Sequence, residues 1–137
     1  MCSKTKVQLI LKEDVKPVHI HARPVALAIQ EQLGAELDRL VASDVITPVD
    51  SSDWAAPIMV ARKANGKIRL CTDSSTGLND ALKDITYPIP NTEDVMANFS
   101  GNTIFSQLDL SDAYLQLRLD ESSQKLTTIS IHKGLFQ

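Results

Sequence analysis

The sequence predicts an α/β domain of the α+β type, because one amphipathic helical repeat, one hairpin signal and several short alternating segments occur along one chain. The chain has 137 residues, of which 43% are hydrophobic and 23% are charged. These proportions are typical of globular domains and not of disordered or fibrous proteins. The longest apolar run, residues 55–61, contains Pro57 and is far shorter than the roughly 20 residues that cross a bilayer. We therefore expect an intracellular protein with no signal peptide, transmembrane segment or membrane partner.

A helix is predicted from Pro24 to about Ser43. Proline favours the first turn of a helix. The apolar residues that follow it recur at helical spacing: Ile29, Leu33, Leu37, Leu40 and Val41. Before the helix, residues 1–23 mix apolar residues with Lys and His, which predicts an extended N-terminal arm with one or two short strands. The chain thus divides into this arm and a domain over residues 24–137.

A β-hairpin is predicted around Asn65-Gly66, a dipeptide that favours a two-residue turn because both of its residues accept a positive φ. Residues 58–61 and 68–71 supply the apolar strands on either side. A two-residue turn pairs Arg62 with Arg69, and like charges directly opposite each other destabilise a sheet. Two explanations are open. The side chains extend into water, which spacing alone favours, or an anion with several charges binds between them.

Basic residues are concentrated in this hairpin. Residues 61–72 hold four basic residues and no acidic one, although the whole chain has a net charge of −3. The overall charge argues against a general nucleic-acid binder, for which a basic face is expected. The local concentration predicts that any anion binds at the hairpin.

The second half of the chain carries one candidate for metal chemistry, Asp109. We expect a loop with a short helix over 73–87, an extended segment over 87–90, a helix capped by Asn91 or Thr92, strands over 104–110, 115–119 and 126–131, and a turn capped by Asp120. Asp109 ends the first of these strands, and Asp112 follows where a turn begins. A carboxylate there suits Mg²⁺, which binds one or two carboxylates together with substrate phosphates. The alternative is that Asp112 caps the turn and Asp109 is merely exposed.

Several blocks of the sequence occur in the order in which they occur in a known family. The blocks are residues 35–40, 46–49, 52–58, 65–71, 87–90, 105–116 and 132–137. They resemble the reverse transcriptase, an RNA-directed DNA polymerase and nucleotidyltransferase, of the Pol polyproteins of gypsy-type LTR retrotransposons. The resemblance covers roughly residues 16–137. It implies the fingers and the first part of the palm of a right-hand polymerase.

The resemblance assigns the basic hairpin to the tip of the fingers. Arg69 matches the arginine of the family's fingertip, and Arg62 or Lys63 matches its lysine. These side chains are implied to grip the triphosphate of the incoming deoxynucleoside triphosphate, which would give the predicted like-charge pair its anion.

The resemblance also assigns roles to residues 109–114. Asp109 matches the first catalytic aspartate, which with the main-chain carbonyl of Leu110 is implied to hold Mg²⁺, or Mn²⁺ in its place. The backbone N–H groups of Asp112 and Ala113 are implied to contact the triphosphate. Tyr114 matches a ring that stacks under the sugar, whereas the residue type alone favours a core aromatic.

The implied partners are an RNA or DNA template with its primer, and the remainder of the Pol polyprotein. The implied location is the cytoplasm or a virus-like particle. One departure from the family lies after Asp73, where Ser74 and Ser75 replace an aromatic and a basic residue. We therefore expect the fingers to be less stable than in the family.

A second departure concerns the catalytic centre. The sequence contains no Asp-Asp dipeptide, which in the family supplies the other two catalytic aspartates. We therefore expect a fragment that is truncated before the second catalytic motif and has no polymerase activity alone. We also expect an unpaired palm edge around Leu108 and residues 126–131, open to aggregation or to pairing with another chain.

The sequence also suggests two other functions. A non-catalytic remnant of a decayed retroelement would at most bind nucleic acid or a protein partner through the fingers. A retroviral-type aspartic protease is suggested by residues 73–77, but that enzyme needs a glycine where this chain has Ser75, so we reject it.

Overall fold

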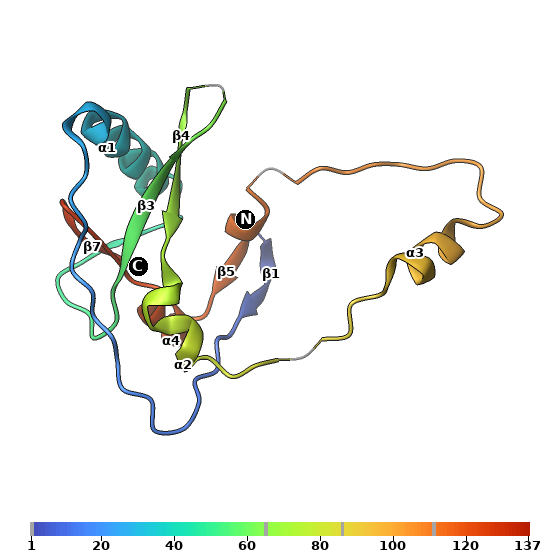
Figure 1. Ribbon diagram of the computed structural model, residues 1–137, viewed down its shortest axis with the longest axis horizontal. Coiled ribbons are helices and arrows are strands. Elements are labelled where there is room, and N and C mark those ends of the chain that lie inside the picture. Colours follow the sequence, from blue (N-terminus) through green and yellow to red (C-terminus); the bar gives the residue numbers. More distant parts are fainter. Residues whose placement is uncertain (1, 65, 86, 111) are drawn as a thin grey trace.

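The computed structural model describes residues 2–64, 66–85, 87–110 and 112–137. Its main element is a five-stranded mixed sheet with the strand order β2-β7-β6-β3-β4 (Figure 1). The strands are β2 (Pro48–Val49), β3 (Ala56–Arg62), β4 (Ile68–Thr72), β6 (Ile129–Ile131) and β7 (Gly134–Phe136). β3 pairs with β6 in parallel, and the other neighbours are antiparallel. The predicted α/β class with a hairpin is thus confirmed.

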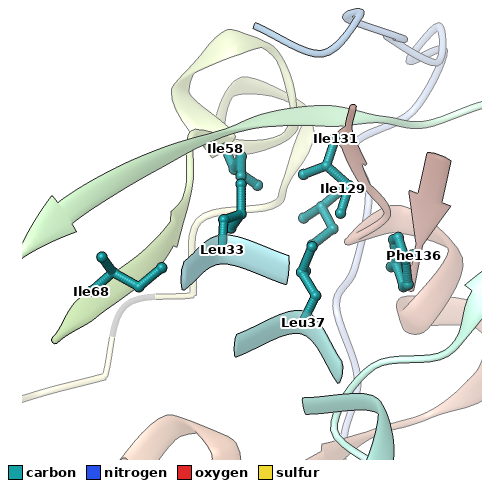
Figure 2. Close-up of a cluster of buried hydrophobic side chains, with 7 residues drawn as sticks. All are labelled: Leu33, Leu37, Ile58, Ile68, Ile129, Ile131 and Phe136. Atoms are coloured by element: carbon teal, nitrogen blue, oxygen red, sulfur yellow. The ribbon is translucent and has the colours of Figure 1, made fainter. Parts of the chain in front are cut away.

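One long helix, α1 (Leu27–Ala42), packs on this sheet. It begins three residues after Pro24 and ends one residue before Ser43, close to the predicted bounds. Its predicted apolar stripe is buried at Leu33, Leu37 and Leu40. Figure 2 shows the resulting core, in which two helix side chains meet four strands: Leu33, Leu37, Ile58, Ile68, Ile129, Ile131 and Phe136. The helical spacing therefore directs these leucines toward the sheet.

The N-terminal arm lies against the domain. Its strand β1 (Cys2–Val7) pairs in parallel with β5 (Leu117–Leu119). Two isolated bridges, Leu11 to Leu82 and His19 to Ala55, attach the rest of the arm. Arm residues also join a second apolar cluster around Trp54, which is only 6% exposed and so is a core residue.

Two buried hydroxyl groups fix the backbone of the arm. The Leu9 N–H donates to Ser123 Oγ at 2.8 Å, and Ser130 Oγ donates to the Ile20 carbonyl at 2.7 Å. Both serines are buried, and a buried polar group stabilises a fold when it is paired in this way. The arm is therefore bound along much of its length by main-chain contacts.

The remaining helices are η1 (Ser74–Thr76), α2 (Leu78–Ala81), α3 (Thr92–Phe99), η2 (Ala113–Gln116) and α4 (Glu121–Leu126). Two of them, α3 and α4, begin at the predicted caps Asn91 and Asp120. The Asn91 side chain accepts the Asp94 N–H at 2.8 Å, and the Asp94 carboxylate accepts the Asn91 N–H at 3.4 Å. These two bonds form a capping box. Asp120 accepts the Ser123 N–H at 2.8 Å. No helix within the described ranges is long and apolar enough to cross a membrane.

The predicted strand over residues 104–110 is wrong. This segment has no regular structure and belongs to an open excursion that also carries α3 (Figure 1). Leu108 is 89% exposed. An alternating sequence becomes a strand only when a neighbour satisfies its backbone N–H and C=O groups, and no strand of the described ranges pairs with this segment.

The predicted sheet edge at residues 126–131 is also wrong. Leu126 ends α4, and β6 lies inside the sheet between β7 and β3. Strands β2 and β7 were not predicted because each is short and shows little alternation. They pair with each other through Pro48 with Phe136 and Val49 with Leu135. The edge strands of the sheet are therefore β2 and β4.

Candidate functional site

The turn of the β3–β4 hairpin is one residue longer than predicted. The Lys63 N–H donates to the Lys67 carbonyl at 2.7 Å, and the Gly66 N–H donates to the Lys63 carbonyl at 3.0 Å. Gly66 has φ +79°, a conformation that glycine adopts without strain, while Asn65 lies outside the described residues. The loop thus contains three residues, 64–66, a form that ends in a left-handed glycine.

This turn changes the partners of both arginines. Arg62 faces Ile68, and Arg69 faces Ala61, so the predicted pairing of Arg62 with Arg69 is wrong. A shift of one residue moves a side chain to the other face of a sheet. Arg62 therefore shares a face with buried Ile68, and Arg69 lies on the opposite face. Lys63 directly follows β3, and its N–H donates to the Lys67 carbonyl, so alternation continued past the strand places Lys63 on the face of Arg69.

The revised register decides between the two candidates for the second basic residue of the hairpin. Arg62 and Lys63 are both exposed, but only Lys63 shares a face with Arg69. An anion that binds on this face meets Arg69 and Lys63 together. The two-arginine clash that the sequence predicted does not occur.

The second predicted segment, residues 109–114, lies in and after the open excursion. Asp109 and Leu110 are exposed, and Tyr114 is 96% exposed, which excludes a core role for this ring. Asp112 has φ +48° and accepts the Leu115 N–H through its carbonyl at 2.8 Å. It precedes η2, which begins at Ala113 as the predicted tight turn. Within the described ranges no ion pair joins Asp109 to Arg69.

Helix α1 carries an ion pair between Glu36 and Arg39. Arg39 donates to both carboxylate oxygens of Glu36, from Nε at 2.8 Å and from Nη2 at 2.7 Å. These hydrogen bonds lower the pKa of Glu36, and the charges of Lys63 and Lys67 lower it further. The bond to Glu36 raises the pKa of Arg39, and the charge of Asp112 adds to this. The i, i+3 spacing of Glu36 and Arg39 on the predicted helix is a local signal for this pair. The influence of Lys63, which is 27 residues further along the chain, depends instead on packing.

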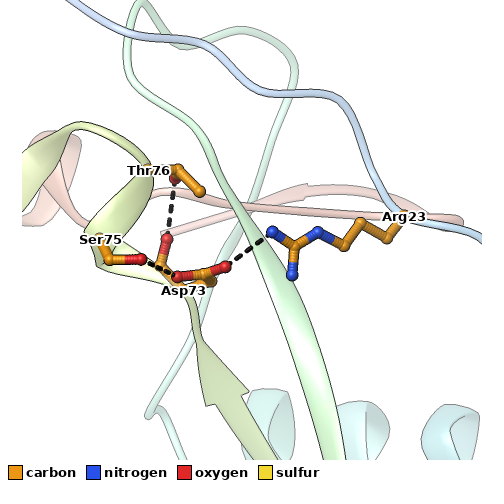
Figure 3. Close-up of polar contacts among 4 residues, drawn as sticks. All are labelled: Arg23, Asp73, Ser75 and Thr76. Atoms are coloured by element: carbon orange, nitrogen blue, oxygen red, sulfur yellow. Dashed lines mark hydrogen bonds and ion pairs between the residues drawn. The ribbon is translucent and has the colours of Figure 1, made fainter.

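The loop after β4 contains an ion pair that the sequence analysis missed. Arg23 Nη2 donates to Asp73 Oδ2 at 2.7 Å, and Ser75 Oγ donates to Asp73 Oδ1 at 2.6 Å (Figure 3). Thr76 Oγ1 donates to the Asp73 carbonyl at 2.8 Å. The bond from Ser75 and that from Arg23 hold the pKa of Asp73 below its usual range. Ser75 stands where the family that the sequence resembles has a basic residue. Arg23, from the arm, thus supplies a cation beside this position.

This network predicts a pH-dependent contribution to stability. We expect Asp73→Asn to lower the urea midpoint of unfolding near neutral pH. Because the folded state lowers the pKa of Asp73, its contribution is fully present above about pH 4 and is lost as the pH falls through the folded pKa. The gap between the native chain and Asp73→Asn should therefore close in acid. Urea titrations from neutral to strongly acidic pH measure it.

A matched control for this prediction is Asp50→Asn, at an exposed aspartate outside the network. Its urea midpoint should follow that of the native chain at every pH. A gap for Asp73→Asn that stays constant into acid would show that the ion pair and the Ser75 bond do not carry the effect.

Comparison with known proteins identifies relatives of this chain. No family model matches it. An uncharacterized protein of Caenorhabditis elegans, K02A2.6, is 45% identical over 139 aligned residues that include all of this chain and 11% of the relative. The Transposon Tf2-3 polyprotein of Schizosaccharomyces pombe is 32% identical over 83 residues, which are 61% of this chain and 6% of the polyprotein.

Solved structures show the same fold. The prototype foamy virus protease-reverse transcriptase, in a mutant form, aligns with 97% of this chain at a TM-score of 0.76 and 20% sequence identity. The foamy viral protease-reverse transcriptase in complex with double-stranded DNA aligns over the same share at a TM-score of 0.75 and 18% identity. This chain covers 18% and 23% of those two proteins. It therefore corresponds to a small part of each relative's length.

Proposed function

Because this chain is related to the Pol polyproteins of retroelements, we propose that it is the fingers and the first part of the palm of a gypsy-type reverse transcriptase. In the complete enzyme it would contribute to RNA-directed DNA synthesis, the addition of deoxynucleotides to a primer 3′-end on an RNA or DNA template. This chain would bind the incoming nucleotide and would supply part of the ligands of the metal ion. The segment would not polymerise alone.

The observation that carries this proposal is the agreement of fold over nearly the whole chain. The foamy virus protein, whose name includes a reverse transcriptase, matches 97% of the chain at a TM-score of 0.76. The alignment thus includes both the basic hairpin and the segment with Asp109. Relatedness to transposon polyproteins supports the same context, and a DNA-bound neighbour supports a nucleic-acid partner.

The hairpin geometry supports a triphosphate on the face of Arg69. Arg69 and Lys63 both lie there and both are exposed. Guanidinium and ammonium groups form charge-assisted hydrogen bonds with phosphate oxygens. In this proposal Arg62, on the other face, contributes only long-range charge. Lys63 is therefore the counterpart of the family's fingertip lysine.

The turn at Asp112 supports a second contact with the nucleotide. A left-handed residue followed by a right-handed helical turn directs successive N–H groups toward one point and suits an anion. Asp112 and Ala113 have this combination. Tyr114, being exposed, can accept a sugar against its ring. These residues would bind the nucleotide's phosphates and orient its sugar.

The described residues supply only part of the ligands that a metal ion needs. Within the described ranges no group of three or more His, Cys, Asp or Glu side chains could hold a metal ion. Asp109 with the Leu110 carbonyl could hold Mg²⁺, or Mn²⁺, only with phosphate oxygens of the nucleotide completing the coordination. When bound, such a metal stabilises the charge of the transferring phosphoryl group. One carboxylate cannot position two ions, hence the expected inactivity of the segment alone.

A primer-extension assay tests whether this chain needs the segment that follows it for DNA synthesis. We expect the chain alone, with Mg²⁺ and deoxynucleoside triphosphates, to add no nucleotide to a DNA primer on an RNA template. A fusion to the segment that follows the aligned region in the C. elegans relative should extend the primer, and Asp109→Ala should abolish that extension. Extension by the chain alone that is lost in Asp109→Ala would contradict the proposed inactivity. An active fusion indifferent to Asp109→Ala would contradict the assignment of Asp109.

A further inference from the structure

The excursion that carries α3 comprises residues 84–115, and every one of them that the structure describes is exposed. Both of its ends are attached to the N-terminal arm: the Lys83 N–H donates to the Ile10 carbonyl at 2.8 Å, and β5 pairs with β1. Between these attachments, α3 lies far from the five-stranded sheet (Figure 1). Unpacked segments longer than about 15 residues are uncommon in compact domains and are often functional. We therefore expect the excursion to have a partner.

Apolar side chains gather on one part of the excursion. Val95, Met96 and Phe99 recur at helical spacing, which places them on one side of α3, and all three are exposed. The ring of Phe105 packs edge-on against that of Phe99, with 5.4 Å between the ring centroids. Leu108, a little further along, is 89% exposed. Exposed apolar side chains that are gathered, and not scattered singly, indicate an interaction surface.

The charge of the excursion narrows the choice of partner. Residues 84–115 contain five acidic residues and no basic one. Nucleic acid does not suit α3, because proteins bind its phosphates through lysine and arginine. Two copies of the chain that met excursion to excursion would place acidic residues opposite acidic residues, which opposes association. The partner that suits this surface is apolar with basic residues at its edge.

The rest of the chain offers no such surface to a second copy. Outside the excursion, the described residues include only four large apolar side chains that are exposed, and these are far apart in the sequence: Ile10, Leu27, Val41 and Met59. The basic hairpin supplies charge but, of these four, only Met59. The partner therefore lies outside this chain.

We propose that residues 92–108 are a docking segment, which binds an apolar, basic-edged surface of the polyprotein region that follows the aligned residues in the relatives. The C. elegans relative aligns with all of this chain but only over 11% of its own length, so most of the polyprotein lies outside the aligned region. This inference rests on the proposed function, in which the rest of the palm follows. An amphipathic helix that places its apolar side in a partner's groove is a common mode of binding.

Hydrogen exchange of the α3 amides tests this inference in two proteins, the full chain and its fusion to the segment that follows the aligned region in the C. elegans relative. A helix as short as α3 is marginal in water without packing. Its amides should therefore exchange rapidly in the chain and about tenfold or more slowly in the fusion.

A leucine substitution tests the apolar contact. Leu108→Ala should speed α3 exchange in the fusion about tenfold, because the buried side chain is lost, and should leave exchange in the chain alone unchanged. The matched control is Leu27→Ala, the same change at a side chain of α1 that is 85% exposed. It should change neither protein. Equal effects of the two substitutions in the fusion would overturn the inference.

A charge substitution tests the basic edge of the partner. Glu93→Gln, in the first turn of α3, should speed α3 exchange in the fusion about threefold at low salt, and the effect should disappear in concentrated salt. Glu31→Gln, an equal change at an exposed residue of α1, should have no effect. A fusion that responds alike to both would overturn the basic edge.

The failure of this inference is distinguishable from that of the proposed function. Rapid α3 exchange in a fusion that extends the primer would overturn the docking segment and leave the proposed function standing. Protection in the chain alone that grows with protein concentration would identify a second copy as the partner and also overturn it. A protected fusion whose nucleotide affinity ignores Arg69→Ala would support the docking segment and contradict the nucleotide site. A fusion with neither protection nor extension would contradict both.

Discussion

Leu33→Ala is expected to lower the free energy of unfolding by about 2–5 kcal/mol, the range for a buried leucine cut back to alanine. Leu33 has 0% exposure and lies in the cluster that joins α1 to the sheet. The substitution removes apolar contacts and leaves a cavity that close-packed neighbours fill only in part. Because the same cluster contains Ile58 and Ile68 of the hairpin strands, loosening of α1 should disturb the base of the hairpin as well.

Urea denaturation followed by circular dichroism measures this effect. Leu27→Ala is the matched control: the same change on the same helix, at a side chain that is 85% exposed. It should alter the free energy of unfolding by less than about 0.5 kcal/mol. Equal losses for the two variants would show that α1 does not pack on the sheet through Leu33.

The elements that sequence predicted well have strong local signals. The helix over α1 follows from the repeat of Leu33, Leu37 and Leu40, and the hairpin from apolar strands on either side of a turn dipeptide. Asn91 and Asp120 cap the helices that follow them. In each case the physical cause lies within a few residues of the element, so one sequence is enough to show it.

The elements that sequence missed depend on distant partners. Residues 104–110 alternate like a strand but have no neighbour to pair with in the described ranges. β2 and β7 are too short to show a pattern and exist because they pair with each other. Arg23 meets Asp73 across 50 residues of sequence. Tertiary pairing, which no local pattern encodes, decides all three.

The candidate site was predicted in its residues but not in its geometry. The chemistry of basic side chains beside a turn pointed to an anion at the hairpin, and family resemblance supplied the roles of Asp109 to Tyr114. One additional residue in the turn then separated Arg62 from Arg69, because side chains alternate with a period of two.

Arg69→Ala is expected to weaken binding of a deoxynucleoside triphosphate with Mg²⁺ about tenfold or more, because a hydrogen bond to a charged group contributes about 1.5–3 kcal/mol. Arg69 is exposed on the hairpin face that also carries Lys63. Its loss removes the fork that matches phosphate oxygens, and Lys63 cannot replace that geometry. Arg69 pairs with Ala61 across the strands, so the substitution should leave the hairpin folded.

The matched control is Arg62→Ala, which removes the same charge from the opposite face of the same hairpin. Its effect should stay within roughly threefold, the influence of a screened surface charge. Similar losses for both variants would mean that the nucleotide responds to overall charge and not to one face. The observed register would then have no bearing on binding.

The central claim is that the face with Arg69 binds the triphosphate of a magnesium-bound nucleotide, and a calorimetric titration of the folded chain with a deoxynucleoside triphosphate and Mg²⁺ tests it directly. The expected result is saturable binding by the native chain, near-native binding by Arg62→Ala and much weaker binding by Arg69→Ala. Equal and negligible affinity in the native chain and Arg69→Ala would contradict the claim.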